Sequence, residues 1–190
     1  MSPRSKEENL KIQQQTRQNI LFTALQAFGE KGYANTTVSY IAKEAGISKG
    51  LIYHYFESKE EILKSLFHFL VEMSKGIMND AQEKAPQEQL KQIITGSVAF
   101  VKTQTNTVRF MTSLAVQPAV IADIEDLLET QKELLMTAMK NIFEALAYEQ
   151  PELEAYHIGA FLDGISLGYM ATKDYPIDQL EQKILKHYKL

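Results

Sequence analysis

The sequence predicts an all-α protein of about nine helices, in which a three-helix unit at the N-terminus precedes a larger helical domain. Nearly every apolar pattern in its 190 residues recurs at the three- and four-residue spacing of a helix rather than at the alternating spacing of a strand. Very small residues also alternate with apolar ones near residue 45, as they do where two short helices cross steeply. These two observations define the fold class.

Composition places the chain among ordinary globular proteins. Hydrophobic residues make up 45% and charged residues 23%. The absence of cysteine excludes disulfides, thiolate zinc sites and cysteine nucleophiles. No apolar run approaches the roughly 18 residues of a membrane span, and the first ten residues are polar where a signal peptide needs an apolar stretch. We therefore expect a cytoplasmic protein with no membrane partner.

The first helix carries its apolar face on Leu21, Leu25 and Phe28, and it should end at Gly32, which suits the left-handed cap position. Two short helices follow. Ser58 to Glu61 then form a capping-box pattern, which predicts the start of a long fourth helix that reaches to about residue 80.

Prolines divide the rest of the chain. Pro86 precedes a helical face that ends near residues 105–107, and a short segment over residues 108–116 follows. Pro118 fits the first turn of a long helix that Pro151 closes. The last two helices are expected over residues 152–172 and 177–188, separated by Pro176.

Residues 37–56 have the residue sizes of a helix-turn-helix. Ala42 keeps the first short helix thin where the second crosses it, and Gly46 allows the tight turn. Ile41, Ile47 and Ile52 are expected to fill the shared core. Such a motif places its second helix in the major groove of duplex DNA.

The groups expected to contact DNA lie on and around that second helix. Lys49 offers charge to a phosphate or a guanine edge, and Gly50 lets the backbone approach closely. Tyr53 and His54 are donors to phosphate, and Leu51 suits a thymine methyl. Flanking contacts are expected at the helix starts. The complete set is Thr36, Thr37, Ser48, Lys49, Gly50, Leu51, Tyr53, His54 and Lys59.

Charge is distributed unevenly along the chain. The net charge is -4, yet residues 1–60 hold eight Lys and Arg against six Asp and Glu, while the remainder holds twelve against eighteen. A mildly basic head on an acidic body suits a protein that touches phosphate at one end.

The ordered motif resembles the N-terminal domain of TetR/AcrR family transcriptional regulators over about residues 14–74. The resemblance rests on Gly32-Tyr33, Thr36-Thr37-Val38, Ile41-Ala42, Ala45-Gly46-Ile47-Ser48-Lys49-Gly50, Ile52-Tyr53-His54-Tyr55-Phe56 and Ser58-Lys59-Glu60. A generic helical bundle has no reason to place these residues at these offsets.

The resemblance implies a DNA-binding domain over residues 14–74 and an effector-binding and dimerisation domain over residues 75–190. It implies a homodimeric repressor that a small, largely apolar molecule releases from a palindromic operator. Ligand binding would shift the fourth helix and change the spacing of the two reading helices. No metal or cofactor is expected.

Three glycines in one helix indicate a close contact. A glycine in a helix interior costs up to about 1 kcal/mol relative to alanine, so Gly159, Gly164 and Gly168 should permit the approach of another helix. With the family resemblance, this predicts a two-fold interface containing Phe161, Gly164, Ile165 and Gly168. Packing inside one subunit is the alternative.

Apolar side chains of the middle helices are candidates for a ligand pocket. The set is Phe67, Phe100, Gln104, Phe110, Met111, Leu114, Met139, Phe143 and Tyr169. The alternative for each is plain core, because any helical bundle needs an apolar stripe.

Two other functions compete with regulation. Helical bundles host di-iron enzymes through paired Glu-x-x-His motifs, and Glu154 and His157 have that spacing, but no second copy exists. No phosphate loop or Gly-x-Ser-x-Gly motif is present either, so we do not expect an enzyme. Architectural DNA binding or protein interaction without a ligand is the other alternative.

Overall fold

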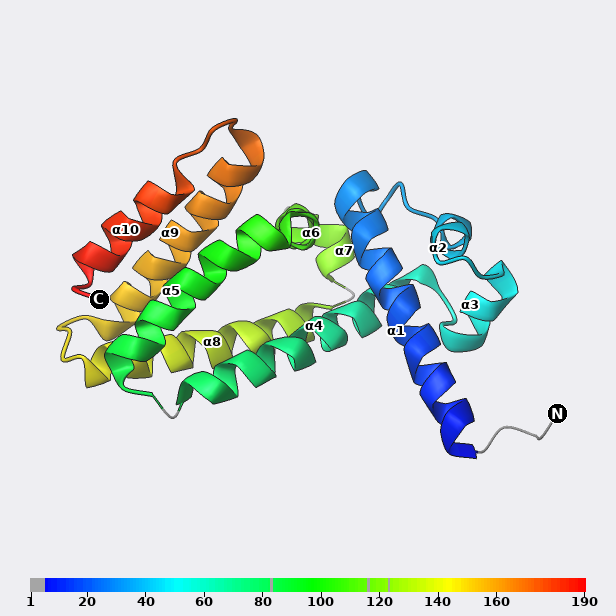
Figure 1. The fold of residues 1–190 in the computed structure, drawn as a ribbon, viewed down its shortest axis with the longest axis horizontal. Helices are drawn as coiled ribbons and strands as arrows, with labels where there is room; N and C mark the ends of the chain where they lie inside the picture. The colour runs from blue at the N-terminus through cyan, green and yellow to red at the C-terminus, as the bar shows by residue number, and fades with distance from the viewer. Residues whose placement is uncertain (1–5, 83, 116, 123) are drawn as a thin grey trace. The chain divides into compact units, whose positions relative to one another are not determined.

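The computed structural model describes residues 6–190 apart from 83, 116 and 123, and it leaves the side chains of 73–82, 115, 118 and 119 undescribed as well. Within these limits the chain is all helical, which confirms the expected fold class (Figure 1). It divides into two compact units, residues 1–71 and 72–190. The described helices of the first unit are α1 (Lys6–Lys31), α2 (Val38–Glu44), α3 (Lys49–Tyr55) and the start of α4 (Lys59–Gln82).

The second unit holds the remaining helices. They are α5 (Pro86–Thr103), α6 (Thr105–Ala115), α7 (Pro118–Ile121), α8 (Glu125–Ala145), α9 (Pro151–Ala171) and α10 (Ile177–His187). In this unit α9 packs against α5, α6, α8 and α10 (Figure 1).

The long helix expected from Pro118 to Pro151 is divided into α7 and α8. The N–H of Ile124 donates to the carbonyl of Ile121 at 2.8 Å, which closes a turn between them. Ile124 is only 3% exposed, so the turn buries an apolar side chain. The acidic pair Glu125 and Asp126 begins α8, and acidic residues are favourable in the first turn of a helix. That pair was the sequence signal for the second start.

The first unit is built on the buried face of α1. Ile20, Ala24 and Phe28 are fully buried, and Ile41 of α2 and Ile52 of α3 are fully buried in the same unit. Gly32 ends α1 with a positive φ of 78°, and its N–H donates to the carbonyl of Phe28 at 2.9 Å. The expected left-handed cap is confirmed.

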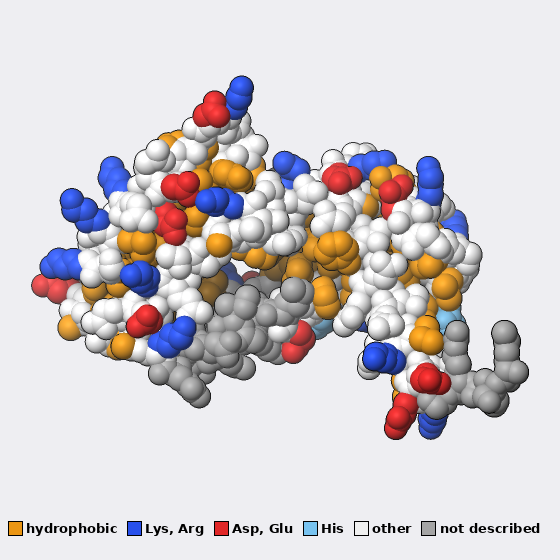
Figure 2. All heavy atoms as spheres, in the orientation of Figure 1, with side chains coloured by type: hydrophobic (Ala, Val, Ile, Leu, Met, Phe, Trp, Pro, Cys, Tyr) orange, Lys and Arg blue, Asp and Glu red, His pale blue; other side chains and the backbone are white. Residues whose placement is uncertain are grey.

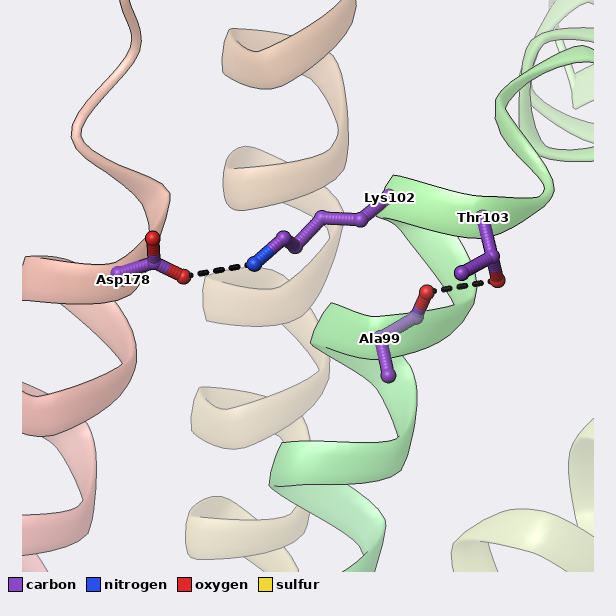
Figure 3. A network of polar contacts seen from close by, with 4 residues as sticks. All are labelled: Ala99, Lys102, Thr103 and Asp178. Carbon is purple, nitrogen blue, oxygen red and sulfur yellow. Dashed lines mark hydrogen bonds and ion pairs between the residues drawn. The ribbon is translucent and has the colours of Figure 1, made fainter.

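The second unit has two buried clusters. The larger joins α5, α8, α9 and α10 through Leu90, Ile94, Met139, Ile142, Phe143, Ala155, Ile158, Ile184, Leu185 and Tyr188. The smaller consists of Val98, Val101, Val108, Ile165 and Ile177. Near it, Lys102 at the end of α5 reaches Asp178 at the start of α10 at 2.9 Å, and the Thr103 hydroxyl donates to the Ala99 carbonyl (Figure 3). The Asp178 carboxylate raises the pKa of Lys102.

A hydrogen-bonded chain fastens the C-terminal end of α10 to α9. The Tyr188 hydroxyl donates to Glu154 Oε2 at 3.0 Å and lies 2.9 Å from His157 Nδ1. Because the single phenolic proton goes to Glu154, His157 Nδ1 must be the donor in the second bond. Burial of Tyr188, followed by its bond to Glu154, raises its pKa above the usual 10.0.

The hydrogen bonds of Tyr188 predict a loss of stability at alkaline pH. Because the pKa of Tyr188 is raised in the folded state, its hydroxyl contributes fully to the free energy of unfolding below pH 10.0. This contribution is lost as the pH rises further, since the same hydroxyl ionises first in the unfolded protein. Melting temperatures between about pH 8 and pH 11 should therefore fall more steeply for wild type than for Tyr188→Phe. Tyr53→Phe, at a position 47% exposed on α3, is the control and should follow wild type. Equal slopes for all three would contradict the assignment.

Candidate nucleic-acid interface

The turn between α2 and α3 has the geometry that the small residues predicted. Gly46 adopts a positive φ of 68°, and the next N–H, that of Ile47, donates to the Ala42 carbonyl at 3.0 Å. Ala42 is 3% exposed and Ile47 is half-buried. A side chain at position 46 would be strained, so glycine is required by the backbone. The two short helices are thus held in a fixed crossing.

Hydroxyl side chains cap both short helices. Thr37 Oγ1 accepts a hydrogen bond from the N–H of Tyr40 at 3.1 Å, and Ser48 Oγ accepts one from the N–H of Leu51 at the same distance. Each cap satisfies one backbone donor that the first turn would otherwise leave without a partner. Both hydroxyl groups keep their protons, and both residues are exposed. Either hydroxyl can therefore donate to a phosphate.

The outer face of α3 carries the groups expected to read DNA. Leu51 is 37% exposed and Tyr53 is 47% exposed, and Lys49, Gly50 and His54 are exposed beside them. The Lys49 ammonium lies 5.7 Å from the centre of the Tyr53 ring. A side chain at Gly50 would meet no atom closer than 4.0 Å, so the backbone is open to an approaching surface.

The inner face of α3 belongs to the core. Ile52 is fully buried and Phe56, the residue after the helix, is 1% exposed. A seven-residue helix therefore divides into one face that anchors it and one face that presents a cation, a phenol, an imidazole and a leucine. That combination of charge, donors and apolar contact fits the major groove.

Thr36 does not lie where DNA can reach its side chain. It is 1% exposed, and its hydroxyl is within hydrogen-bonding distance of the carbonyls of Gly32 (2.9 Å) and Ala27 (3.2 Å). The expectation that Thr36 faces a phosphate is therefore corrected. Its hydroxyl satisfies backbone groups at the end of α1 instead, a tertiary role that its neighbour Thr37 does not share.

Two basic residues of α1 that the motif did not single out, Lys31 and Arg17, lie over aromatic rings of the first unit. The Lys31 ammonium lies 3.5 Å from the centre of the Tyr40 ring, which connects the end of α1 to α2. Arg17 lies over the Phe56 ring at 4.9 Å and donates to Ser65 Oγ at 2.9 Å. These contacts join residues on different helices, so helical periodicity carries no signal for them.

Anionic charge is placed at the start of α4. The Ser58 hydroxyl accepts from the N–H of Glu61 at 3.2 Å, and the Glu61 carboxylate accepts from the N–H of Glu57. Hydrogen bonds from its own backbone N–H and then from Ser58 lower the pKa of Glu60 from its usual 4.5. The expected cap at Ser58 is present, and these carboxylates complement the positive end of the helix.

The residues expected to line a ligand pocket have different environments. Phe67 lies in the first unit and is 5% exposed. Phe110, Leu114, Met139 and Phe143 are buried, while Phe100 and Met111 are 41% and 44% exposed. Gln104 is exposed where α5 meets α6, and Tyr169 packs against the smaller cluster.

For Met139 and Phe143 the alternative of plain core applies. Both belong to the larger cluster, and the Phe143 ring contacts Tyr148 and Tyr188 with centroid separations of 5.3 and 5.4 Å. A surface hollow of about 470 Å³ lies where α8 ends and α9 begins. It is lined by other residues: Lys140, Gln150, Pro151, Glu152, Leu153 and Tyr156.

The residues expected at a dimer interface also have different environments. Ile165 is 2% exposed and Phe161 packs against both clusters, so these two side chains face the interior of the subunit. A Cβ at Gly168 would lie 2.3 Å from the Tyr175 ring, so this glycine makes room for an aromatic side chain of its own subunit. Gly164, in contrast, is exposed, and a Cβ at this position would meet no atom within 4 Å. Ile165 is therefore corrected to the core of its own subunit, while an interface at Phe161, Gly164 and Gly168 stays a prediction.

The two residues with di-iron spacing take part in other contacts. Glu154 and His157, the residues with di-iron spacing, are hydrogen-bonded through Tyr188. Among the described residues there is no group of three or more His, Cys, Asp or Glu side chains that can hold a metal ion. No helix in the described part of the chain is long and apolar enough to cross a bilayer.

Known proteins similar to this chain are regulators of transcription. The family described as "Bacterial regulatory proteins, tetR family" matches residues 20–66. The HTH-type transcriptional regulator YerO of Bacillus subtilis is 42% identical over 82 residues, which are 41% of this chain and 28% of that protein. The HTH-type transcriptional regulator BetI of Brucella suis is 28% identical over 164 residues, which cover 84% of this chain and 82% of that protein.

Solved structures show the same fold. A transcriptional regulator from Rhodococcus superposes with a TM-score of 0.79 at 18% identity, covering 91% of this chain and 94% of that one. The regulator FadR from Bacillus subtilis, solved in complex with stearoyl-CoA, gives a TM-score of 0.73 at 24% identity and covers 90% of this chain and 96% of that one.

The capped, two-helix motif with its exposed reading face, together with these similarities, defines a helix-turn-helix DNA-binding regulator of transcription. Residues 20–66 are thus similar to the tetR family of bacterial regulatory proteins, and most of the chain is similar to the transcriptional regulator BetI.

Proposed function

We propose that this protein is a homodimeric repressor that binds a palindromic operator through α3 and is released by a small, largely apolar effector. The observation that carries the proposal is the exposed face of α3, where Lys49, Leu51 and Tyr53 stand on a helix anchored by Ile52. Residues 14–74 supply DNA binding, and residues 75–190 supply effector binding and dimerisation.

Contacts to DNA divide into two kinds. Leu51 and Tyr53 lie where they meet base edges in the major groove, and Lys49 lies where it meets a guanine edge or a phosphate. Thr37 and Ser48, which cap the two helices, donate their hydroxyl protons to phosphates on either side. A homodimer repeats this set about one helical turn, roughly 34 Å, away, which requires a palindromic site.

The effector is proposed to bind within residues 75–190. Phe100 of α5 and Met111 of α6 keep 41% and 44% of their surfaces exposed, so apolar surface is available to a ligand there. A regulator of the same fold is described in complex with stearoyl-CoA, whose acyl chain is apolar, and this supports an effector with a large apolar part. Helix α4 runs through the boundary between the two units, so a shift of α4 is the proposed route to the reading helices.

Dimerisation is proposed through the outer face of α9. Its exposed residues repeat at three- and four-residue spacing and are mostly apolar or small: Leu153, Tyr156, Ala160, Gly164, Leu167 and Ala171. Leu153 is 59% exposed and Leu167 is 53% exposed, and Gly164 allows close approach of a second helix. Figure 2 shows hydrophobic side chains at the surface among charged ones. A two-fold axis would pair this stripe with its own copy.

The dimer proposal predicts that charge on this stripe separates the subunits. The double variant Leu153→Glu/Leu167→Glu should sediment as a monomer at micromolar concentration, because each buried carboxylate would lose its hydration. Leu134→Glu, at a position 57% exposed on α8, is the matched control and should remain a dimer. A wild-type monomer, or an unchanged dimer in the double variant, would refute the proposal.

Selection of bound sequences from a random duplex pool tests the proposed function. The pool should yield one palindromic sequence, and the selected duplex should bind more weakly when stearoyl-CoA is added as the probe. Recovery of unrelated sequences with salt-dependent affinity would favour the architectural alternative. A palindrome that no apolar probe releases would leave specific DNA binding and remove the proposed effector class.

A further inference from the structure

Two of the four histidines of the chain lie beside each other at one end of the α9–α10 pair. His157 is near the start of α9 and His187 is the last residue of α10, and the two helices run antiparallel (Figure 1). The centroids of the two rings are 5.8 Å apart, and the ring planes are inclined by 73°. Both residues are exposed, so an ion from solution can reach either ring.

The hydrogen bonds of Tyr188 fix the tautomer of His157. The Tyr188 hydroxyl gives its proton to Glu154 Oε2 at 3.0 Å, so His157 Nδ1, 2.9 Å from the same hydroxyl oxygen, donates to it. The other ring nitrogen of a neutral imidazole, Nε2, then keeps its lone pair. A ring that donates through one nitrogen to a hydrogen-bonded carboxylate chain is typical of a histidine that binds a metal ion through the other.

The ring of His187 is able to turn toward the same point. It packs edge-on against Tyr188 with a centroid separation of 4.8 Å, and within the described part of the chain no hydrogen bond holds it. When two imidazoles bind one ion at about 2.0–2.1 Å, their ring centres stand roughly 5–6 Å apart. The separation of 5.8 Å between His157 and His187 lies in that range.

The available ligands determine which ions fit this pair. The chain has no cysteine, and the Glu154 carboxylate is engaged by Tyr188. No group of three His, Cys, Asp or Glu side chains that can hold a metal occurs among the described residues, so water must complete the coordination. Imidazole nitrogen suits Zn²⁺, Ni²⁺ and Cu²⁺, whereas Mg²⁺ and Ca²⁺ prefer oxygen ligands.

We propose that His157 and His187 bind one Zn²⁺, Ni²⁺ or Cu²⁺ ion per chain, which joins α9 to α10. Tyr188 and Glu154 are positioning residues for His157 and do not contact the ion. The site is separate from Phe100 and Met111, where the apolar effector is proposed to bind. A transition-metal ion is thus a second small ligand of the second unit, and its binding is measured without DNA.

Calorimetric titration with Zn²⁺ alone, on protein without a histidine tag, counts the ions bound per chain. Wild type should bind one ion, and His157→Ala/His187→Ala should bind none. His68→Ala removes an exposed histidine of the first unit, so it is the matched control and should bind as wild type does. An excess of Mg²⁺ should not compete with Zn²⁺. Circular dichroism establishes that each variant is folded.

Three further measurements test the geometry of the site. With Cu²⁺ as the probe, electron paramagnetic resonance should show two coordinated nitrogens in wild type and one in His187→Ala. Tyr188→Phe keeps both imidazoles and removes the hydroxyl that orients His157, so Zn²⁺ should bind about tenfold more weakly with unchanged stoichiometry. Zn²⁺ should raise the melting temperature of wild type and leave that of His157→Ala/His187→Ala unchanged.

Four outcomes would overturn the proposal. Wild type that binds none of the three ions has no such site, and unchanged binding in His157→Ala/His187→Ala would place the ligands elsewhere. An equal loss of affinity in His68→Ala and His187→Ala would mean that any surface histidine attracts the ion. One ion per two chains would mean that two subunits share the ligands. Unchanged affinity in Tyr188→Phe would remove the positioning role of Tyr188 alone.

Discussion

The double variant Lys49→Ala/Tyr53→Ala is expected to lose specific DNA binding while it keeps its fold. Both side chains are exposed on α3 and neither supports the core, whose contribution from this helix is Ile52. Loss of one interaction with a base edge or phosphate costs about 1–3 kcal/mol. Because two such interactions disappear from each of two half-sites, affinity for the selected operator should fall by more than roughly a thousandfold. Fluorescence anisotropy with the selected duplex measures the fall in affinity.

Single variants of Tyr53 separate the contributions of its ring and its hydroxyl to the affinity for DNA. Tyr53→Phe keeps the ring and removes the hydroxyl, so the affinity that it retains relative to Tyr53→Ala reports the apolar contact. Lys183→Ala removes an exposed lysine from α10 and is the matched control for charge. Near wild-type affinity in the double variant, with a normal melting temperature, would show that α3 is not the reading helix.

Phe143→Ala is expected to have the largest effect on stability. The ring is fully buried among α5, α8, α9 and α10 and contacts Tyr148 and Tyr188. Removal of a buried phenylalanine ring costs about 3–5 kcal/mol, through lost burial and the cavity left behind. Chemical denaturation followed by far-ultraviolet circular dichroism measures the change.

Phe100→Ala is the matched control for that prediction. Its ring is 41% exposed, so its removal should change stability by less than about 0.5 kcal/mol. If Phe143 lined a ligand pocket instead of the core, its removal would cost little stability and would change the affinity for an apolar ligand. A small loss in Phe143→Ala would therefore contradict the assignment to the core.

Local rules predicted much of the DNA-binding unit. The positive φ of Gly32 and Gly46 and the cap at Ser48 each follow from one residue and its near neighbours. Division of α3 into a buried and an exposed face follows from helical periodicity. The exposed face of α3 could therefore be predicted residue by residue from the sequence.

Tertiary contacts account for what the sequence did not reveal. Thr36 and Thr37 are adjacent and chemically identical, yet one hydroxyl is buried against α1 and the other caps α2 at the surface. Lys59 resembles any exposed lysine at a helix start until the turn that it binds is known. No pattern along one helix distinguishes these cases.

In the second unit, too, the sequence could not predict which helices bury a given apolar residue. An apolar stripe identifies the face of a helix that is buried, but not what buries it. Ile165 and Gly168 of α9 pack within their own subunit, while Leu167 beside them is exposed. Phe143 and Phe100 are both aromatic residues on helical faces, and only one is enclosed. The pairing of helices decides these environments.

The central claim, that α3 reads duplex DNA, is tested most directly by the ratio of two affinities. Wild-type protein is titrated with the selected duplex and with a duplex of shuffled sequence at the same salt concentration. We predict that the selected duplex binds at least about a thousandfold more tightly, and that Leu51→Ala and Tyr53→Ala reduce this ratio. A ratio near one, or a large ratio that neither substitution changes, would contradict the claim.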